Sequence, residues 1–272
     1  KACMSDCFSG KALQKKSSYL VIAWAAGPIL APALGGYLQH ALGWQACFCF
    51  LAGYALLLGV ICYFFLPETK PTREVFSLVS VVKNYSRVFQ SAVFVGSVVC
   101  AGLVYALMAV ANVMGPFIIQ VSLHYSPVQY GAIALSLGVS WFVGSLFNRL
   151  LLNYVDIQAL LIVGSLGLVA LASGSVVSAV YLPFTLLAVQ VPLLLIFVLG
   201  GVLMPCAFAL SLSVFPSLGG TANAIAGVGM SLVTAAVTWV ATHLTTKTQL
   251  PLFGLYWVMG ALVCVTVIVI YR

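Results

Sequence analysis

Uncharged, apolar stretches of about 20 residues recur along this chain, and they restrict its fold more than any other feature. A helix of that length crosses the roughly 30 Å hydrocarbon core of a bilayer and satisfies its own backbone hydrogen bonds there. Charged residues make up 6% of the chain, too few to cover a soluble domain with polar surface. A β-barrel would alternate apolar and polar positions, but runs such as 193-LLLIFVLGGVLM-204 do not. The sequence therefore predicts an all-α, polytopic transmembrane protein.

The apolar stretches predict eight transmembrane helices. The division between the fifth and sixth rests on Pro183 within 181-YLPF-184, so seven or nine spans are the alternatives. The first apolar run is too long for the core of a signal peptide, and it predicts a retained span. The eight predicted spans are 18–39, 45–66, 92–120, 130–152, 157–181, 183–212, 219–245 and 250–271.

The distribution of Lys and Arg predicts the orientation in the membrane, because basic loops remain on the cytoplasmic side. With eight spans, all basic residues except Lys247 fall on the same side of the membrane. That side is therefore predicted to be cytoplasmic and to hold both ends of this chain. Its basic residues are Lys1, Lys11, Lys15, Lys16, Lys70, Arg73, Lys83, Arg87, Arg149 and Arg272.

The longest polar segment, residues 67–90, separates two predicted spans from six. Its polar and apolar residues alternate at helical spacing, which predicts an amphipathic helix on the cytoplasmic membrane surface, most simply as a connector. Because two plus six is a lopsided division and the chain begins with Lys1, we expect spans to precede it.

A stripe of small residues marks the first span, in 27-GPILAPALGG-36. Gly27, Ala31 and Gly35 recur every four residues, which allows another helix to approach closely, and two prolines, Pro28 and Pro32, bend the helix. The spacing alone indicates only helix packing. The string that ends in Gly36 also resembles the antiporter motif of exporters of the major facilitator superfamily, although Ala31 stands where glycine is usual.

Other motifs agree with this resemblance and follow in the same order: 5-SDCFSGK-11, 64-FFLPET-69, 126-SPVQYG-131 and 204–227. Together they are similar to the bicyclomycin and chloramphenicol resistance (Bcr/CflA) subfamily of drug:proton antiporters. The resemblance implies the major facilitator fold, with about eight of twelve helices present, in a bacterial inner membrane. Residues 1–66 would then supply the last two helices of an N-terminal bundle, 67–90 the connector, and 91–272 a C-terminal six-helix bundle.

The resemblance also implies that two such bundles rock about a central cavity, with small-residue helices as the surface on which they slide. We expect the Gly27, Ala31 and Gly35 face to pack against a second small-residue stripe on the fourth span. Replacing Gly35 with Leu should then abolish transport and leave membrane insertion intact. The second stripe consists of Ala132, Ser136, Ser140 and Gly144.

Substrate contacts are expected from polar and aromatic residues inside the spans, because a largely apolar cavity with few polar groups suits amphiphilic compounds. Tyr105 and Asn112 are seven residues apart and share one helix face. Trp24, Trp141 and Asn223 are further candidates, and packing is the alternative role for each aromatic residue.

The remaining chemistry is sparse. No Asp, Glu, Lys or Arg lies well inside a predicted span, so a proton-coupling carboxylate would have to lie elsewhere. We expect no metal or other cofactor, because the three histidines are far from one another and from any cluster of Cys or carboxylates. Nucleic acid is not an expected partner, because the basic residues adjoin spans and their placement follows from topology. No nucleophile with a base, or phosphate loop, indicates an enzyme.

Three functions remain open at this point. The first is an exporter of drugs or small metabolites, with protons as the coupling ion. The second is a carrier of the same fold for siderophores or sugars. The third is a truncated remnant that does not transport. Transport assays separate the first two, and the DNA upstream of Lys1 tests the third.

Overall fold

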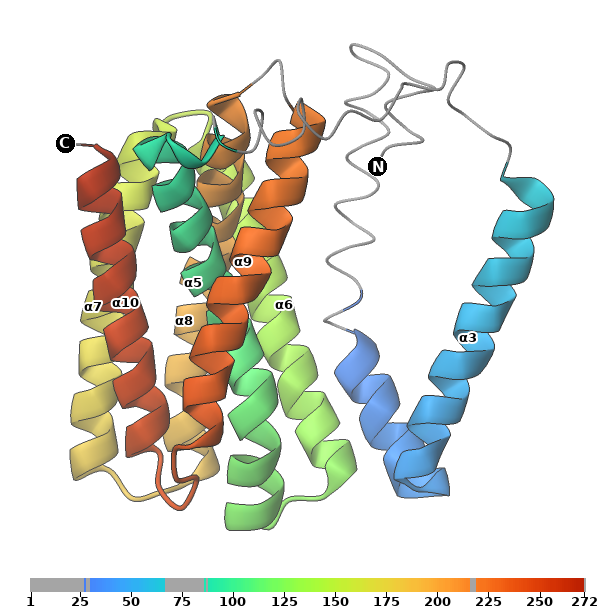
Figure 1. The fold of residues 1–272 in the computed structure, drawn as a ribbon. Helices are drawn as coiled ribbons and strands as arrows, with labels where there is room; N and C mark the ends of the chain where they lie inside the picture. The colour runs from blue at the N-terminus through green and yellow to red at the C-terminus, as the bar shows by residue number, and fades with distance from the viewer. Residues whose placement is uncertain (1–26, 28–29, 67–85, 87, 216–218, 272) are drawn as a thin grey trace. The chain divides into compact units, whose positions relative to one another are not determined.

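The computed structural model describes residues 27, 30–66, 86, 88–215 and 219–271. The chain divides into two compact units, each considered separately below: unit 1 comprises Lys1–Ser77 and Ser126–Leu135, and unit 2 comprises Leu78–Tyr125 and Ser136–Arg272. The described residues of both units are almost entirely helical, and no strand occurs among them. Figure 1 shows the helices with their labels.

Unit 1 contains a helical segment at 30–42, followed by α3 (Trp44–Phe65). Gly43 lies between the two helices with φ of 84°, a backbone conformation that glycine adopts at no steric cost. None of the side chains of α3 is buried, and its mean hydropathy suits a membrane span. A helix that is apolar on every side belongs either in a protein core or in lipid.

Unit 2 begins with α5 (Ala92–Pro116), which continues as a π-helical turn, η1 (Phe117–Ser122). The next helix, α6 (Pro127–Leu151), starts in unit 1 and runs into unit 2. The remaining helices are α7 (Ile157–Tyr181), α8 (Leu186–Ser213), α9 (Gly219–Thr242) and α10 (Leu250–Ile270).

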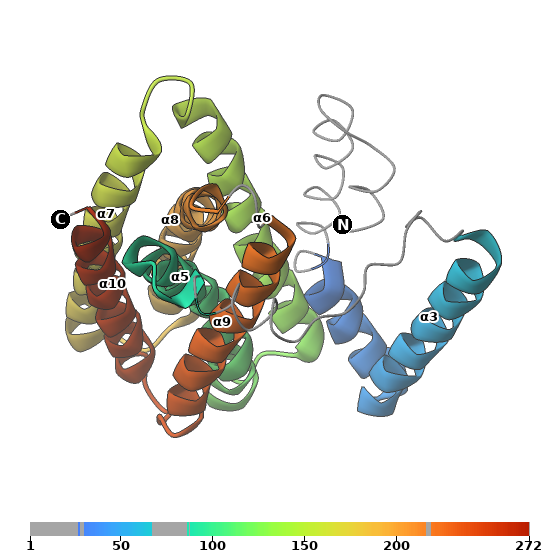
Figure 2. The same ribbon diagram turned by 45° about the horizontal axis from the view of Figure 1, so that its top comes forward.

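The central helix of unit 2 is α5, which lies among α8, α9 and α10 (Figure 2). Its contact with α9 is close because a Cβ added at Gly102 would lie 2.8 Å from the Val233 Cβ. The hydroxyl of Thr234 donates to the carbonyl of Gly102 at 3.3 Å across this contact. On the α10 side, the buried Tyr256 hydroxyl donates to the Leu107 carbonyl at 2.8 Å. Polar side chains thus join α5 to two of its neighbours.

A second group of helices, α7, α8 and α10, packs in the same way. A Cβ added at Gly164 of α7 would lie 2.7 Å from the Leu203 side chain of α8. The indole nitrogen of Trp257 on α10 donates to the Ser173 hydroxyl of α7 at 3.0 Å. Small residues and single hydrogen bonds are the usual means of helix association in membranes, where burial of apolar surface gives no net attraction.

The all-α prediction is confirmed, and seven helices of the described residues are long and apolar enough to cross a membrane. The predicted division at 181-YLPF-184 is correct, because α7 ends at Tyr181 and α8 begins at Leu186. For the first predicted span, only residues 27 and 30–39 are described. The predicted amphipathic helix at 67–90 falls almost wholly outside the described residues.

Candidate functional site

One face of α5 carries polar groups that the rest of unit 2 leaves uncovered. Fourteen of the 25 residues of α5 are buried, yet Tyr105 is 42% exposed and Asn112 is also exposed. With the half-buried Ala109 and Pro116, these residues recur at spacings of four, three and four, which places them on one side of a helix. We call Tyr105, Ala109, Asn112 and Pro116 the α5 stripe.

Pro116 adds a backbone acceptor to the α5 stripe. In a regular helix the amide of residue 116 would donate to the carbonyl of Asn112, but proline has no N–H. The next amide, that of Phe117, donates to Met114 instead. The Asn112 backbone carbonyl therefore loses its ordinary donor at the position where the Asn112 side-chain amide is exposed. Among the described residues, neither Asn112 nor Tyr105 has a hydrogen-bond partner for its side chain.

Such a site can bind a ligand through uncharged hydrogen-bonding groups. The Tyr105 hydroxyl both donates and accepts, the Asn112 amide does the same, and the backbone carbonyl accepts. An exposed amide within a membrane helix is costly against lipid, so it favours a water-filled path or a protein neighbour. The predicted pairing of Tyr105 and Asn112 on one face is therefore present in the structure, with the backbone acceptor beside them.

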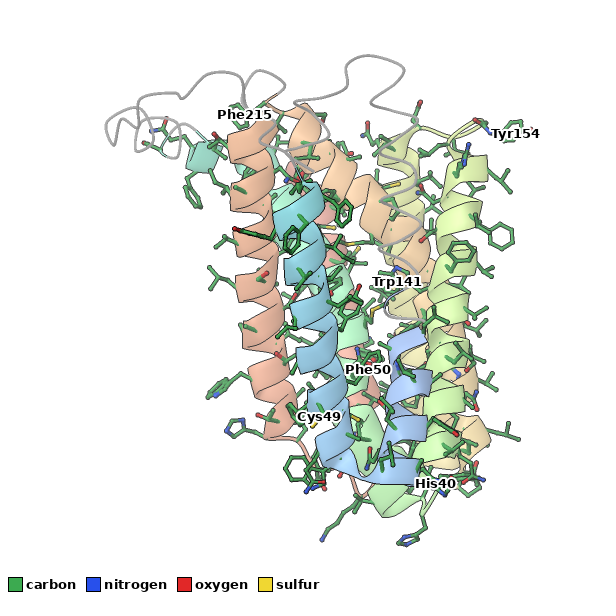
Figure 3. The ribbon with its side chains drawn as sticks, turned by 90° about the vertical axis from the view of Figure 1, so that its right-hand side faces the viewer. His40, Cys49, Phe50, Trp141, Tyr154 and Phe215 are labelled. Carbon is green, nitrogen blue, oxygen red and sulfur yellow. The ribbon has the colours of Figure 1, made fainter. Side chains whose placement is uncertain are left out.

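Trp141 lies in a different environment, between α6 and α8. Its ring packs edge-on against Phe197, with centroids 5.9 Å apart. A Cβ added at Gly200 would lie 2.5 Å from the Trp141 ring, so the side chain fills the space above this glycine. Figure 3 shows Trp141 midway along the helix. These contacts indicate helix packing, the alternative role considered for this residue.

The other two substrate candidates gain less from the structure. Asn223 is half-buried on α9, away from the α5 stripe in sequence and without a described hydrogen bond. Trp24 lies outside the described residues, as does Pro28 of the small-residue motif.

The small-residue motif makes a close contact within unit 1, through its residues Pro32 and Gly36 and not through the Gly27 and Gly35 face. A Cβ added at Gly36 would lie 2.6 Å from the Pro127 carbonyl oxygen, and one at Gly131 would lie 3.0 Å from the Pro32 carbonyl oxygen. At Gly27 and Gly35, by contrast, an added Cβ would have no atom within 4 Å. The contact between the 30–42 helix and the start of α6 is therefore centred on Gly36.

The predicted partner stripe on α6 needs a related correction. An added Cβ at Gly144 would collide with the Val198 carbonyl oxygen of α8 and would lie 3.1 Å from the Gly201 Cα. The predicted pairing is thus wrong for Gly144, which packs against α8 instead. The physical reason is that α8 also lacks side chains at this level, so α6 turns Gly144 toward α8.

Two buried or half-buried amides that join α6 to α8 were missed as site residues. Asn148 is 3% exposed, and its amide nitrogen lies 2.8 Å from the Val202 carbonyl oxygen and 2.9 Å from the Cys206 sulfur. Gln190 of α8 donates to the Ser136 hydroxyl of α6 at 3.1 Å. The cost of leaving an amide unpaired in lipid marked both residues in the sequence, but their partners required the fold.

The described part of the chain has few charges, all near helix ends. They are Arg149 in the last turn of α6, Asp156 before α7 and Lys247 between α9 and α10. No group of three or more potential metal ligands occurs among the described residues. The polar chemistry inside the described spans is therefore that of neutral groups.

Comparisons with known proteins bear on the motif resemblance. Residues 1–238 match the family model for the Major Facilitator Superfamily. The chain is also 23% identical over 273 residues to a bicyclomycin resistance protein homolog of Haemophilus influenzae, an alignment that covers 99% of this chain and 67% of the relative. The family model agrees with the superfamily that the motifs resemble, and the relative agrees with the subfamily.

Proposed function

This chain belongs to the Major Facilitator Superfamily, and on that premise we propose that it exports drugs or small metabolites across a bacterial inner membrane in exchange for protons. Members of this family are transporters and not enzymes, and the chain is a multi-pass membrane protein. Within the proposed carrier, residues 1–66 belong to the N-terminal bundle, 67–90 form the cytoplasmic connector and 91–272 form the C-terminal bundle. The partners of this carrier are the bilayer, an amphiphilic substrate and protons.

The α5 stripe is the observation that carries the proposal. In a helix with more than half of its residues buried, Tyr105 and Asn112 leave a hydroxyl and an amide exposed beside the carbonyl freed by Pro116. A transport path must offer such groups, because a substrate that sheds water needs hydrogen-bond partners in its place. Neutral groups suit uncharged or weakly polar compounds, which bind without the cost of burying an unpaired charge.

Export and proton exchange are what the motif resemblance implies, and the relative's name, a bicyclomycin resistance protein homolog, agrees with a drug as the substrate. No Asp or Glu lies inside a helix of the described residues, so the proposal assigns the coupling carboxylate to a part of the carrier beyond them. Addition of substrate to inverted vesicles that hold a proton gradient should then partly dissipate that gradient. A gradient that stays unchanged while substrate is transported would exclude proton exchange.

The direct test compares Asn112→Leu with wild type in an efflux-deficient bacterial host, using resistance to bicyclomycin or chloramphenicol as the measurement. Loss of the amide should lower resistance about tenfold, which corresponds to one or two lost hydrogen bonds in a desolvated site. Thr266→Val is the matched control, since that hydroxyl donates only to the Leu262 carbonyl of its own helix, at 2.7 Å.

Protein amounts in the membrane fraction must be equal for the comparison to count. Full resistance in the Asn112→Leu variant would exclude the α5 stripe from the substrate path. If wild type confers no resistance to a panel of amphiphilic drugs but takes up or exports a siderophore or sugar, the drug-export proposal is wrong and another carrier function is correct.

A further inference from the structure

A proline inside α8 removes a hydrogen bond from a buried part of unit 2. Pro205 lies in the interior of this helix and has no N–H, so the Gly201 carbonyl lacks its usual donor four residues on. Gly201 is buried. Lipid supplies no hydrogen-bond donor to such a group, and an unsatisfied buried carbonyl is costly.

A serine of α6 supplies the missing donor. The Ser145 hydroxyl lies 3.3 Å from the Gly201 carbonyl oxygen and 3.1 Å from the carbonyl oxygen of Trp141 in its own helix. The Trp141 carbonyl already has the Ser145 amide as its regular helical donor. Only the Gly201 carbonyl depends on the hydroxyl, because its helix offers it no donor.

Asn148 extends this connection by one turn. It lies three residues after Ser145 and therefore on the same side of α6. Its amide nitrogen donates to the Val202 carbonyl at 2.8 Å and contacts the Cys206 sulfur at 2.9 Å, on both sides of Pro205 in the sequence. Ser145 and Asn148 thus reach the two consecutive carbonyls at the point where proline disturbs α8.

The two helices can approach this closely because both lack side chains at the crossing. A Cβ added at Gly201 would collide with the Trp141 carbonyl oxygen and would lie 3.0 Å from the Ser145 amide nitrogen. An added Cβ at Gly144 would collide with the Val198 carbonyl oxygen in the same way. Backbone contacts backbone on both sides, which brings the short Ser145 side chain within reach of α8.

We propose that Ser145 and Asn148 are positioning residues that hold the last part of α8, residues 201–213, to α6, and that Ser145 does so by replacing the backbone donor removed by Pro205. Residues 136–151 of α6 and residues 201–213 of α8 then move as one body when the carrier changes conformation. The hydrogen-bond replacement stands on the contacts above. Its consequence for transport rests on the proposed function.

Cys206 provides a probe for the test, because its thiol is buried beside Asn148. In a full-length protein that retains Cys206 as its single cysteine, the rate of alkylation by N-ethylmaleimide reports how often this part of α8 separates from α6. Ser145→Ala should raise the rate about three- to tenfold, the range given by one interhelical hydrogen bond in a membrane. Pro205→Ala restores the amide donor to Gly201, so Ser145→Ala in that background should change the rate less than about twofold.

Ser165→Ala is the matched control, because the buried Ser165 hydroxyl donates only to the Ile162 carbonyl within α7. It should leave Cys206 alkylation unchanged in both backgrounds. The proposal is overturned if Ser145→Ala has the same effect with and without Pro205, if it has no effect with Pro205, or if Ser165→Ala has an equal effect. Size-exclusion chromatography identifies any variant that does not fold. If Ser145→Ala does not fold, Ser145→Gly, which also lacks the hydroxyl, replaces it as the test variant with and without Pro205.

The alkylation measurement does not depend on transport, so it separates this proposal from the proposed function. If Ser145 behaves as expected but wild type exports no drug, the hydrogen-bond replacement stands and the export function is wrong. If wild type exports drugs, Ser145→Ala should slow export, and Pro205→Ala should restore part of the rate.

Discussion

Gly144→Ala should destabilise unit 2 although it adds only one methyl group. The new Cβ would collide with the Val198 carbonyl oxygen and would lie 2.8 Å from the Val198 carbonyl carbon, where ordinary contact begins at 3.4 Å. The carbonyl carbon alone, at 3.4 minus 2.8, requires α6 and α8 to separate locally by about 0.6 Å, and the nearer oxygen requires more. The obstructing atoms belong to the backbone of a helix, so no side-chain rotation relieves the collision.

Two costs follow from that separation. Overpacking of a close contact costs about 1–3 kcal/mol. The Ser145 to Gly201 hydrogen bond, already 3.3 Å long, would exceed hydrogen-bonding distance, which adds about 0.6 kcal/mol by the average measured between membrane helices. The total of about 2–4 kcal/mol corresponds to a fall of roughly 4–15 °C in apparent melting temperature for a protein of this size.

The assay is loss of the monodisperse protein peak after heating in detergent, measured on the full-length protein. Gly174→Ala in α7 is the matched control, because its added Cβ would have no atom within 4 Å. Without a collision, alanine in place of a helical glycine should leave the melting temperature equal or raise it slightly. If Gly144→Ala and Gly174→Ala have the same apparent melting temperature, the backbone contact between α6 and α8 does not exist as described.

Other changes test the remaining contacts and the orientation. Gly36→Ala should impair transport and Gly35→Ala should be tolerated, because only the Cβ added at Gly36 meets the Pro127 carbonyl oxygen, at 2.6 Å. If Gly35→Ala impairs transport and Gly36→Ala does not, the packing face predicted from the motif is correct. Tyr256→Phe should lower the apparent melting temperature by a few degrees, since it loses a hydrogen bond worth about 0.6–1.7 kcal/mol, and an unchanged value would contradict that bond. In a protein with no other cysteine, Tyr181→Cys at an exposed position should react with a membrane-impermeant maleimide in whole cells. Tyr154→Cys, also at an exposed position, should react only after the cells are lysed. The opposite labelling pattern would show that the predicted topology is inverted.

Figure 3 shows why the orientation test is informative. Tyr154, before α7, and Phe215, after α8, lie at the same end of unit 2. The predicted spans require this shared end, because the chain crosses the membrane an even number of times, through α7 and α8, between Tyr154 and Phe215. The structure fixes that these loops share an end, and the labelling experiment decides on which side of the membrane that end lies.

The sequence alone determined the class of protein and the limits of most helices. Length and apolar character suffice for this, because each membrane helix must satisfy its own backbone bonds and exclude charge, whatever its neighbours are. Pro183 alone marked the boundary between two otherwise continuous apolar runs, and α7 and α8 are indeed separated there. The shared face of Tyr105 and Asn112 also followed from helical periodicity.

Only the tertiary structure decided which small residues face which partner. Gly35, Gly36 and Gly144 all belong to small-residue patterns in the sequence, yet of these three an added Cβ meets backbone only at Gly36 and Gly144. A helix with small residues on several sides offers more than one packing face, and the sequence spacing is the same for each. Likewise, Pro205 shows in the sequence that a carbonyl has lost its donor, but the approach of α6 decides that Ser145 replaces it.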